Sequence, residues 1–267
     1  MRNHKDFVAD NVISIGRDND FIELCNLWIR GCIPHNYAQN FTWLSIPVIQ
    51  VPQDIYAVQE LIWRIKPDLV IETGIAHGGS LVLSASILAL LDYADAVNLG
   101  GVLNPKESKR KVLGIDIDIR SHNRLAIEAH PLSHLIEMIE GSSVDEAVIN
   151  KVKTRSQDFK RVIVFLDSNH THDHVLAELE AYAPLVSPDS YCVVWDTGVE
   201  DLPEGFVTDR PWGKGNNPKT AVWEYLKRIQ QEGRIAADGN SLKFEIDKTI
   251  EHKIAITAAP DGFLKRI

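Results

Sequence analysis

Stretches that favour a β-strand alternate with stretches that favour a helix from residue 68 onward, and this pattern constrains the fold most. Five short apolar runs are typical of buried strands, at 68–72, 111–116, 134–141, 161–167 and 190–196. Helical patterns separate them, at 79–97, 122–130, 145–155 and 172–186. Repeated strand–helix–strand units form right-handed crossovers and build a parallel sheet covered by helices. We therefore predict an α/β, Rossmann-like fold.

The two ends of the chain depart from this alternation. Near the C-terminus, KFEID (243–247) and KIAIT (253–257) are joined by a short polar link and predict an antiparallel hairpin. Residues 1–67 are rich in aromatic side chains and carry helical patterns of their own. We predict an N-terminal extension over 1–67, acting as a cap or an oligomerisation segment, and an α/β domain over 68–267.

The composition excludes several classes of function. The chain has 267 residues and a formal net charge of −9, and an acidic surface disfavours nucleic acid as the main partner. Its three cysteines have no metal-binding or redox spacing, which is typical of free thiols in a reducing cytosol. The N-terminus lacks the apolar core of a signal peptide, and the apolar stretch 81–91 is too short to cross a membrane. We predict a cytoplasmic protein without membrane insertion.

Polar residues stand at the end of each predicted strand of the parallel sheet. They are Glu72, Asp116, Ser142, Asp167 and Asp196. Ligands of open parallel sheets bind beyond the carboxyl ends of the strands. This convergence of residues at one edge therefore predicts a binding site there.

A glycine-rich loop, ETGIAHGGS (72–80), joins the first strand of the parallel sheet to the following helix. Gly74 permits a positive φ, and the glycines at 78 and 79 let a ligand approach the backbone. The start of the helix offers free N–H groups to a nucleotide-like ligand. The spacing G-x-x-x-G-G differs from the dinucleotide fingerprint, and no lysine is present for a phosphate-binding P-loop.

An acid before the first glycine suits a cation better than a phosphate. S-adenosylmethionine carries an α-amino group and a sulfonium but no phosphate, so we favour it as the ligand. Asp116 would then accept hydrogen bonds from the ribose hydroxyls, and Ser142 would lie near the adenine. A nicotinamide cofactor and a plain strand-to-helix turn remain alternatives.

A second group of residues follows the fourth and fifth strands of the parallel sheet. Adjacent strands lie about 4.8 Å apart, so Asp167 and Asp196 can share one cation, and oxygen ligands favour Mg²⁺ or Mn²⁺. Such an ion binds two oxygens of a diol and acidifies the one that reacts. His170 is then a candidate general base. Three alternatives remain. Asp167 and Asp196 would only cap turns or helices at the strand ends, the histidines would belong to a solvated helix start, or His170 and His174 would bind zinc.

The ordered motifs ETGIAHGGS, GIDIDIRSHNR, EGSS, LDSNHTHDHVLAEL and GFLKRI resemble the cephalosporin hydroxylase / rhamnosyl O-methyltransferase family. The resemblance covers roughly residues 40–267. It implies a class I S-adenosylmethionine-dependent methyltransferase with a seven-stranded sheet whose last strand is reversed. The domain 68–267 would then be the methyltransferase domain.

The resemblance also implies site residues. We expect cofactor contacts from Glu72, Thr73, Gly74, His77, Gly79, Ser80, Asp116, Ser142 and Asp167. We expect Mg²⁺ ligands at Asp167 and Asp196, and catalytic roles for Asp167 and for His170, the base. Trp195 stands where relatives often carry a glutamate ligand, so Thr197 or water would complete the metal site, or the metal would bind weakly or be absent.

We therefore predict an S-adenosylmethionine-dependent O-methyltransferase that acts on a hydroxyl of a sugar or polyhydroxylated small molecule, in carbohydrate or natural-product biosynthesis. Mg²⁺ would assist, and the protein would be a homo-oligomer. The long loop 202–220, with Arg210, Trp212 and Lys214, is either an acceptor cover or a surface loop whose tryptophan packs against the domain. A nicotinamide-dependent oxidoreductase and a non-catalytic subunit of a two-protein tailoring enzyme are the alternatives, the second because of Trp195.

Overall fold

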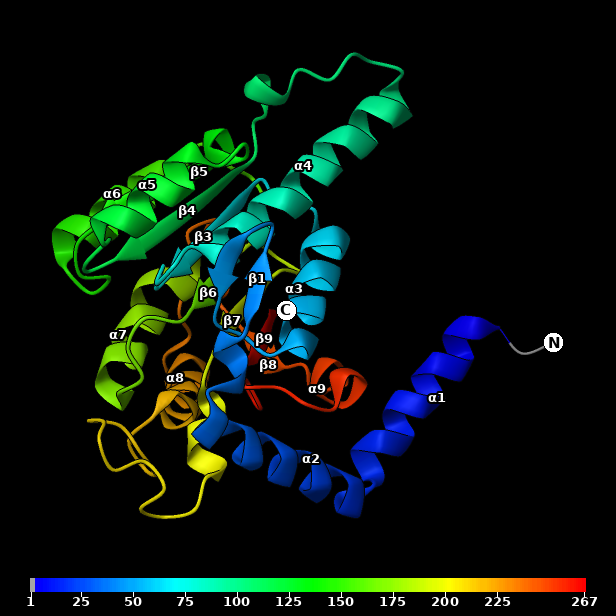
Figure 1. Ribbon diagram of the computed structural model, residues 1–267, viewed down its shortest axis with the longest axis vertical. Helices are drawn as coiled ribbons and strands as arrows, with labels where there is room; N and C mark the ends of the chain where they lie inside the picture. Colours follow the sequence, from blue (N-terminus) through cyan, green and yellow to red (C-terminus); the bar gives the residue numbers. More distant parts are fainter. Residues whose placement is uncertain (1–2) are drawn as a thin grey trace.

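The predicted alternation appears as a seven-stranded sheet in the computed structural model of the chain, which describes residues 3–267 (Figure 1). The strands lie in the order β5-β4-β3-β6-β7-β9-β8. They are β3 (Leu69–Thr73), β4 (Lys111–Asp116), β5 (Ile136–Glu140), β6 (Val162–Leu166), β7 (Tyr191–Val194), β8 (Phe244–Ile246) and β9 (Phe263–Arg266). Strands β3 to β7 pair in parallel, and β9 runs antiparallel between β7 and β8. The fold prediction, including the reversed last strand, is confirmed.

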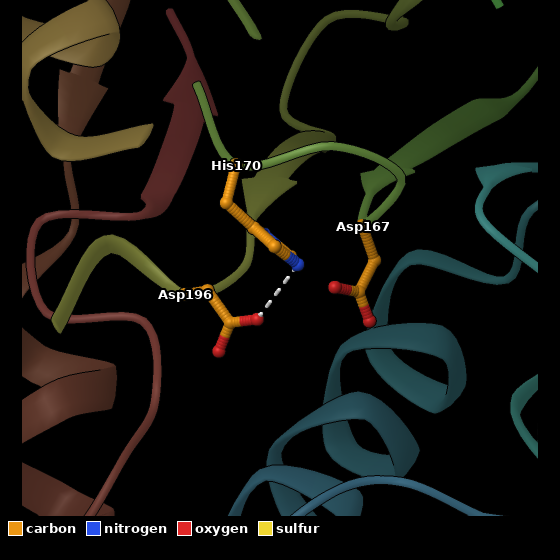
Figure 2. A group of neighbouring side chains, drawn as sticks. All are labelled: Asp167, His170 and Asp196. Carbon is orange, nitrogen blue, oxygen red and sulfur yellow. Dashed lines mark ion pairs between the residues drawn. The ribbon is translucent and has the colours of Figure 1, made fainter. Parts of the chain in front are cut away.

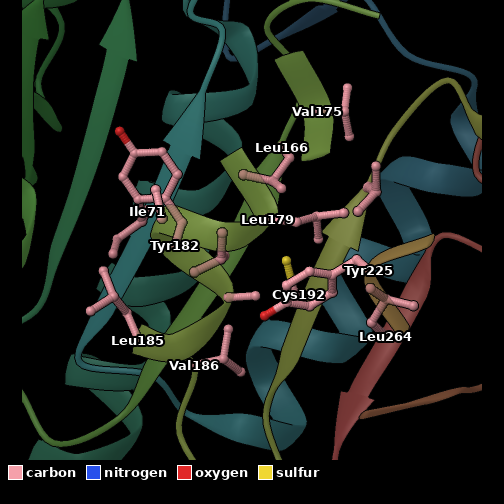
Figure 3. Packing of buried hydrophobic residues seen from close by; sticks show 14 of the residues in the cluster. Ile71, Leu166, Val175, Leu179, Tyr182, Leu185, Val186, Cys192, Tyr225 and Leu264 are labelled. Atoms are coloured by element: carbon pink, nitrogen blue, oxygen red, sulfur yellow. The ribbon is translucent and has the colours of Figure 1, made fainter. Parts of the chain in front are cut away.

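Helices cover both faces of this sheet. They are α3 (Pro52–Ile65), α4 (Gly79–Leu99), α5 (Ser121–Ala129), α6 (Glu146–Ser156), α7 (His172–Tyr182), α8 (Pro218–Glu232) and α9 (Lys248–Ile254). Successive side chains of β3 point to opposite faces of the sheet, as the two-residue period of a strand requires. Each face has its own cluster of buried apolar residues, and Ile71 belongs to the first and Val70 to the second. In the first cluster, Leu179 and Tyr225 are fully buried above the sheet (Figure 3). Burying such a side chain stabilises the fold by about 1.5–3 kcal/mol.

The predicted C-terminal hairpin is correct in its first strand and wrong in its second. KFEID contains β8, but residues 248–254 form α9, and the partner strand is β9 at 263–266. The Asp247 side chain accepts a hydrogen bond from the backbone N–H of Thr249 (3.1 Å) and caps a helix directly after β8. The strand that pairs with β8 instead contains Phe263 and Leu264, and both side chains are fully buried.

The N-terminal segment forms an arm and a small hairpin before it joins the main layers. The arm consists of α1 (His4–Arg17) and α2 (Asn19–Cys32) and lies at the side of the molecule in Figure 1, where α1 contacts α9. Two 3₁₀ turns, η1 (Ile33–His35) and η2 (Tyr37–Gln39), lead to the antiparallel pair β1 (Phe41–Trp43) and β2 (Ile46–Val48).

The β1–β2 pair packs on α4, where the indole N–H of Trp43 donates to the hydroxyl of Ser86 (3.0 Å). The helix that follows, α3, buries Leu61 and Ile62 in the core beside the sheet. A domain boundary at residue 68 stays a prediction.

One described helix, α4, is long and apolar enough by length and composition to cross a membrane. Its N-terminal half packs in the core, where Leu81, Leu83 and Leu88 are fully buried. A core helix of this kind passes the same test, so the finding is weak evidence for a membrane span.

Candidate active site

The glycine loop runs from the end of β3 to the start of α4 and is held against the end of β6. Gly74 has a φ of +87°, and a Cβ atom there would lie 2.0 Å from the carbonyl oxygen of Asp167. A Cβ atom on Gly79 would lie 2.2 Å from the carbonyl oxygen of Pro47. Only glycine fits both positions, and the loop is therefore clamped between β6 and the β1–β2 pair.

Asp116 organises this loop from the end of β4. Its Oδ2 accepts hydrogen bonds from the backbone N–H groups of Ile75 (2.8 Å) and Ala76 (3.2 Å). Its Oδ1 accepts from the N–H of Asp118 (3.1 Å). Oδ2 thereby uses both of its acceptor positions, whereas Oδ1 retains one. A contact between Asp116 and ribose hydroxyls is compatible with this arrangement and stays a prediction.

Glu72 and Thr73, at the end of β3, are buried beneath the loop. Glu72 is 3% exposed and accepts a hydrogen bond from the Ser80 hydroxyl. Burial raises the pKa of Glu72 to about 7, and the Ser80 hydrogen bond offsets part of that rise. The carbonyl oxygen of Thr73 accepts from the backbone N–H of Asp167 (2.9 Å). These contacts join the glycine loop to Asp167, the first of the two predicted metal ligands.

A cavity of about 290 Å³ opens between the glycine loop and the ends of β6 and β7. Of the predicted cofactor residues, those that line it are Gly74, His77, Gly79, Ser80 and Asp167. Those outside its lining are Glu72, Thr73, Asp116 and Ser142. Ser142 lies in the turn after β5, where its carbonyl accepts from the backbone N–H of Asp145 (3.0 Å).

Asp167, His170 and Asp196 converge at one side of this cavity (Figure 2). Each offers one ligand atom, and these atoms all lie within 4.8 Å of one another. The Nε2 atom of His170 lies 3.4 Å from Oδ2 of Asp196. Burial, followed by the charges of Asp196 and Glu72, raises the pKa of Asp167 well above its usual range. The described residues that line the cavity include no lysine or arginine, so a bound cation would relieve this repulsion.

The parallel register of β6 and β7 explains this convergence. Leu166 pairs with Val194, and the next residues along each strand lead to Asp167 and Asp196. Asp196 adopts a left-handed conformation with a φ of 54°, which aspartate tolerates better than most residues. The expected proximity of these two carboxylates is therefore what the structure shows.

Trp195 and Thr197 flank Asp196 but turn away from a ligand role. Trp195 is 4% exposed, and its ring packs against Phe165 (6.4 Å) and Phe263 (6.1 Å) in the core, although the residue also lines the cavity. The hydroxyl of Thr197 is buried and donates to the carbonyl oxygen of Pro260 (2.6 Å). The structure does not bring Thr197 into the lining of the cavity.

The ring of His170 is covered by the long loop before α8. Its centroid lies 4.8 Å from that of Trp212 in an edge-to-face arrangement. The guanidinium of Arg210 lies 5.5 Å from the centroid of the Trp212 ring. The His170 side chain is only 18% exposed as a result. The predicted cover loop thus packs on the candidate base.

The two neighbouring histidines have other partners. His172 lies 2.8 Å from the hydroxyl of Thr220 and 3.1 Å from Glu224, which ties α7 to α8. His174 lies 3.1 Å from the Ser143 hydroxyl and 3.2 Å from the Ser168 hydroxyl. His174 is therefore engaged in a separate hydrogen-bond group, which disfavours a zinc site shared with His170.

Two polar residues near the cavity carry no signal in the sequence. Gln50 lines the cavity and is 9% exposed, and its Oε1 has no hydrogen-bond partner among residues 3–267. Asp54, on α3, is fully buried and accepts from the backbone N–H of Ala258 (2.8 Å). Burial raises the pKa of Asp54 to about 7, although hydrogen bonds from Ala258 and Thr257 lower it. Both residues reach the site only through tertiary packing.

The chain is 28% identical over 228 residues to the rhamnosyl O-methyltransferase of Mycobacterium tuberculosis H37Rv, covering 84% of this chain and 78% of that protein. It is 28% identical over 241 residues to the rhamnosyl O-methyltransferase of Mycobacterium leprae, covering 90% and 87%.

Solved structures with a similar arrangement include CmcI with Mg²⁺ and S-adenosylmethionine, at 15% identity and a TM-score of 0.48 over 86% of this chain and 77% of that one. They also include an O-methyltransferase from Bacillus cereus with SAH, at 14% identity and a TM-score of 0.45 over 93% and 90%. The model of the family described as rhamnosyl O-methyltransferase/CmcI matches residues 35–267. The resemblance predicted from the motifs is confirmed, and the chain belongs to the rhamnosyl O-methyltransferase/CmcI family.

Proposed function

We propose that this chain transfers the methyl group of S-adenosylmethionine to a hydroxyl oxygen of a sugar or another polyhydroxylated small molecule, with assistance from Mg²⁺. The observation that carries the proposal is the group formed by Asp167, His170 and Asp196, which faces the glycine loop across one cavity. Membership of a family of O-methyltransferases and the rhamnosyl O-methyltransferase names of the relatives support it.

The residues fit a divalent cation. Two carboxylates at adjacent strand ends are hard oxygen ligands. Burial and then the charges of Asp196 and Glu72 raise the pKa of Asp167, and a bound cation would offset both effects. Asp167 and Asp196 would hold Mg²⁺. Trp195 supplies no third ligand, because an indole ring has no carboxylate. When bound, the ion supplies positive charge beside the acceptor oxygen, and S-adenosylmethionine supplies the electrophilic methyl group.

His170 would act as the general base. Its Nε2 would take the proton of the acceptor hydroxyl as that oxygen attacks the methyl carbon. Asp196, 3.4 Å from Nε2, would stabilise the imidazolium that forms. Trp212 packs on the imidazole ring and would limit the access of water to it. The chemistry needs the acceptor oxygen held in line with the methyl group, so positioning by this group of residues would supply much of the rate.

The cofactor would lie along the glycine loop. Its α-ammonium would be held near Glu72, whose raised pKa a neighbouring cation would lower. Gly74 and Gly79 would let it approach the backbone, Asp116 would face its ribose and Ser142 its adenine. Gln50 would add one hydrogen-bond acceptor, because its Oε1 is buried at the cavity without a partner in the described chain.

The test is methyl transfer by the isolated protein. The protein would be incubated with S-adenosylmethionine labelled in the methyl group and with a panel of glycosides, in Mg²⁺ or in EDTA. We expect labelled product that depends on Mg²⁺ and falls sharply in His170→Ala. Cofactor binding without transfer to any acceptor would instead favour a non-catalytic subunit, the role that Trp195 leaves open. Binding of a nicotinamide cofactor would favour the oxidoreductase.

We also propose that the chain forms a homo-oligomer in the cytoplasm through its N-terminal arm. The arm exposes large apolar side chains, with Phe7 50%, Leu24 62% and Leu27 52% exposed, and α1 has no buried residue. Exposed apolar surface of this kind is typical of an interface. Light scattering on the wild type and on the double variant Leu24→Lys with Leu27→Lys tests the proposal. A wild-type monomer would contradict it.

A further inference from the structure

We propose that Asp54, a buried residue of α3 outside the cavity lining, is a positioning residue that fixes the Asp196 carboxylate for metal binding. It would act through the C-terminal linker, residues 255–262, which joins α9 to β9. This inference rests on the proposed function, since it assigns a further residue to the same candidate metal site.

Asp196 depends on its surroundings because its backbone has a sparsely populated conformation. Its φ of 54° lies in the left-handed region, where a residue with a side chain is held by the structure around it. Its side chain is 44% exposed, so packing restrains the carboxylate little. The direction of this predicted metal ligand is therefore set by the backbone on either side of it.

The C-terminal linker holds the backbone that follows Asp196. The carbonyl oxygen of Ala258 accepts a hydrogen bond from the backbone N–H of Gly198 (3.1 Å). The carbonyl oxygen of Pro260 accepts from the Thr197 hydroxyl (2.6 Å), and Thr197 is fully buried. These two hydrogen bonds fix the two residues next to Asp196, so a shift of the linker would move the carboxylate.

Asp54 holds the other side of the C-terminal linker. Its Oδ2 accepts from the backbone N–H of Ala258 (2.8 Å), and the Thr257 side chain is a second hydrogen-bond partner. Ala258 is thus bonded to α3 through its N–H and to Gly198 through its carbonyl oxygen. Asp54 is fully buried, so water has no access to replace its carboxylate. The linker is therefore fixed between α3 and the residues next to Asp196.

Loss of the Asp54 carboxylate would release this arrangement. The N–H of Ala258 would lose its partner, and an unpaired donor is costly enough for the linker to shift and pair it elsewhere. The Gly198 contact would shift with it. Residues that orient metal ligands typically change metal affinity by about 10- to 100-fold when they are removed.

The charge of Asp54 is the competing explanation for an effect on the metal. Burial raises the pKa of Asp54, and the charge of Asp196 adds to that rise, so the two carboxylates are close enough to interact. An ionised Asp54 would attract a cation without positioning anything. Asparagine separates the two explanations, because its amide oxygen can accept from Ala258 but the side chain carries no charge.

The first test measures the binding of Mn²⁺ alone to the purified protein by electron paramagnetic resonance, without cofactor or acceptor. We expect Asp54→Ala to weaken Mn²⁺ binding by about 10- to 100-fold, and Asp54→Asn by less than about threefold. In activity assays, the Mg²⁺ concentration at half-maximal rate should rise by the same factors. Equal losses in the two variants would show an effect of charge and would overturn the positioning role, as would unchanged affinity in Asp54→Ala.

Asp68→Ala is the matched control. Asp68 accepts from the backbone N–H of Arg161 (3.2 Å) directly before β3, at the opposite end of the sheet from the site. The substitution removes the same kind of hydrogen bond and should leave Mn²⁺ affinity unchanged. A loss as large as that of Asp54→Ala would mean that the effect is general destabilisation and would contradict the inference.

The second test removes the other attachment of the linker, which keeps the inference testable if Asp54→Ala does not fold. Thr197→Val lacks the hydroxyl that donates to Pro260 and should weaken Mn²⁺ binding as Asp54→Ala does. Thr197→Ser keeps the hydroxyl and should recover most of the affinity. Wild-type affinity in Thr197→Val would contradict the role of the linker.

The third test reads the backbone around Asp196 without metal. Amide hydrogen exchange in η6 (Thr197–Asp201), followed by mass spectrometry, should be about tenfold faster or more in Asp54→Ala than in the wild type. If the wild type binds no Mn²⁺ but exchange accelerates in the variant, the Mg²⁺-assisted function fails and the positioning role stands. If the wild type binds Mn²⁺ and the variant changes neither binding nor exchange, the positioning role fails and the function stands.

Discussion

Replacement of Gly74 by alanine tests how the glycine loop is held against the candidate metal site. The new Cβ atom would lie 2.0 Å from the carbonyl oxygen of Asp167 and 2.6 Å from its carbon. Both are backbone atoms, so the end of β6 must move until the contact reaches about 3.4 Å. Overpacking of this kind costs about 1–3 kcal/mol. The left-handed φ of +87° adds about 1–2 kcal/mol for a residue with a side chain.

Gly100→Ala is the matched control. Gly100 also has a positive φ, of +65°, but a Cβ atom there would meet nothing within 4 Å. Gly100→Ala should lower the free energy of unfolding by about 1–2 kcal/mol, because only the positive φ disfavours a side chain there. Gly74→Ala should lower it by about 2–5 kcal/mol, because the steric contact adds to the same effect. Equilibrium unfolding in urea measures both free energies. The reduced backbone freedom of the unfolded chain is common to the two variants and cancels. Equal losses of stability would refute the close approach of the glycine loop to Asp167.

Three further predictions concern the site. His170→Ala should lower kcat by about 10²–10⁴ while the calorimetric affinity for S-adenosylhomocysteine stays nearly unchanged, and a collapse of that affinity would remove His170 from the role of base. Asp196→Asn should abolish the difference in rate between Mg²⁺ and EDTA, and a variant that still responds to Mg²⁺ like the wild type would show that Asp196 is not a ligand. Asp54 has a folded pKa of about 7, raised from 3.8, so the folded state holds its proton more tightly and loses stability as pH rises from about 4 to about 7. Urea unfolding at pH 5 and pH 8 measures this loss of stability, and Asp54→Asn should reduce it by up to a few kcal/mol. A variant with the same pH dependence as the wild type would contradict the burial of a charge at Asp54.

Much of the fold was predictable because the parallel strands are continuous apolar runs. Val70 and Ile71 are buried on opposite faces of β3, so both had to be apolar, and the strand is visible in the sequence without knowledge of its neighbours. The second strand of the hairpin was not predictable in this way. KIAIT has the alternation of a strand, yet the Asp247 cap starts helix α9, which takes in its first two residues. The strand forms later in the chain, at β9, where Phe263 is fully buried.

The positions of the site residues were predictable where the pairing of strands in the sheet alone brings them together. Asp167 and Asp196 follow adjacent parallel strands, so their proximity follows from the sheet. The packing of Trp195 into the core and the approach of Gln50 to the cavity depend on tertiary contacts with distant segments, and neither has a local signal.

The most direct test of the account is calorimetric titration of the protein with S-adenosylhomocysteine in the presence of EDTA. EDTA separates binding at the proposed cofactor site from binding at the proposed metal site. We predict micromolar binding, which would place an amino acid nucleoside on the glycine loop beside Glu72. The absence of binding would contradict the assignment of S-adenosylmethionine as the methyl donor.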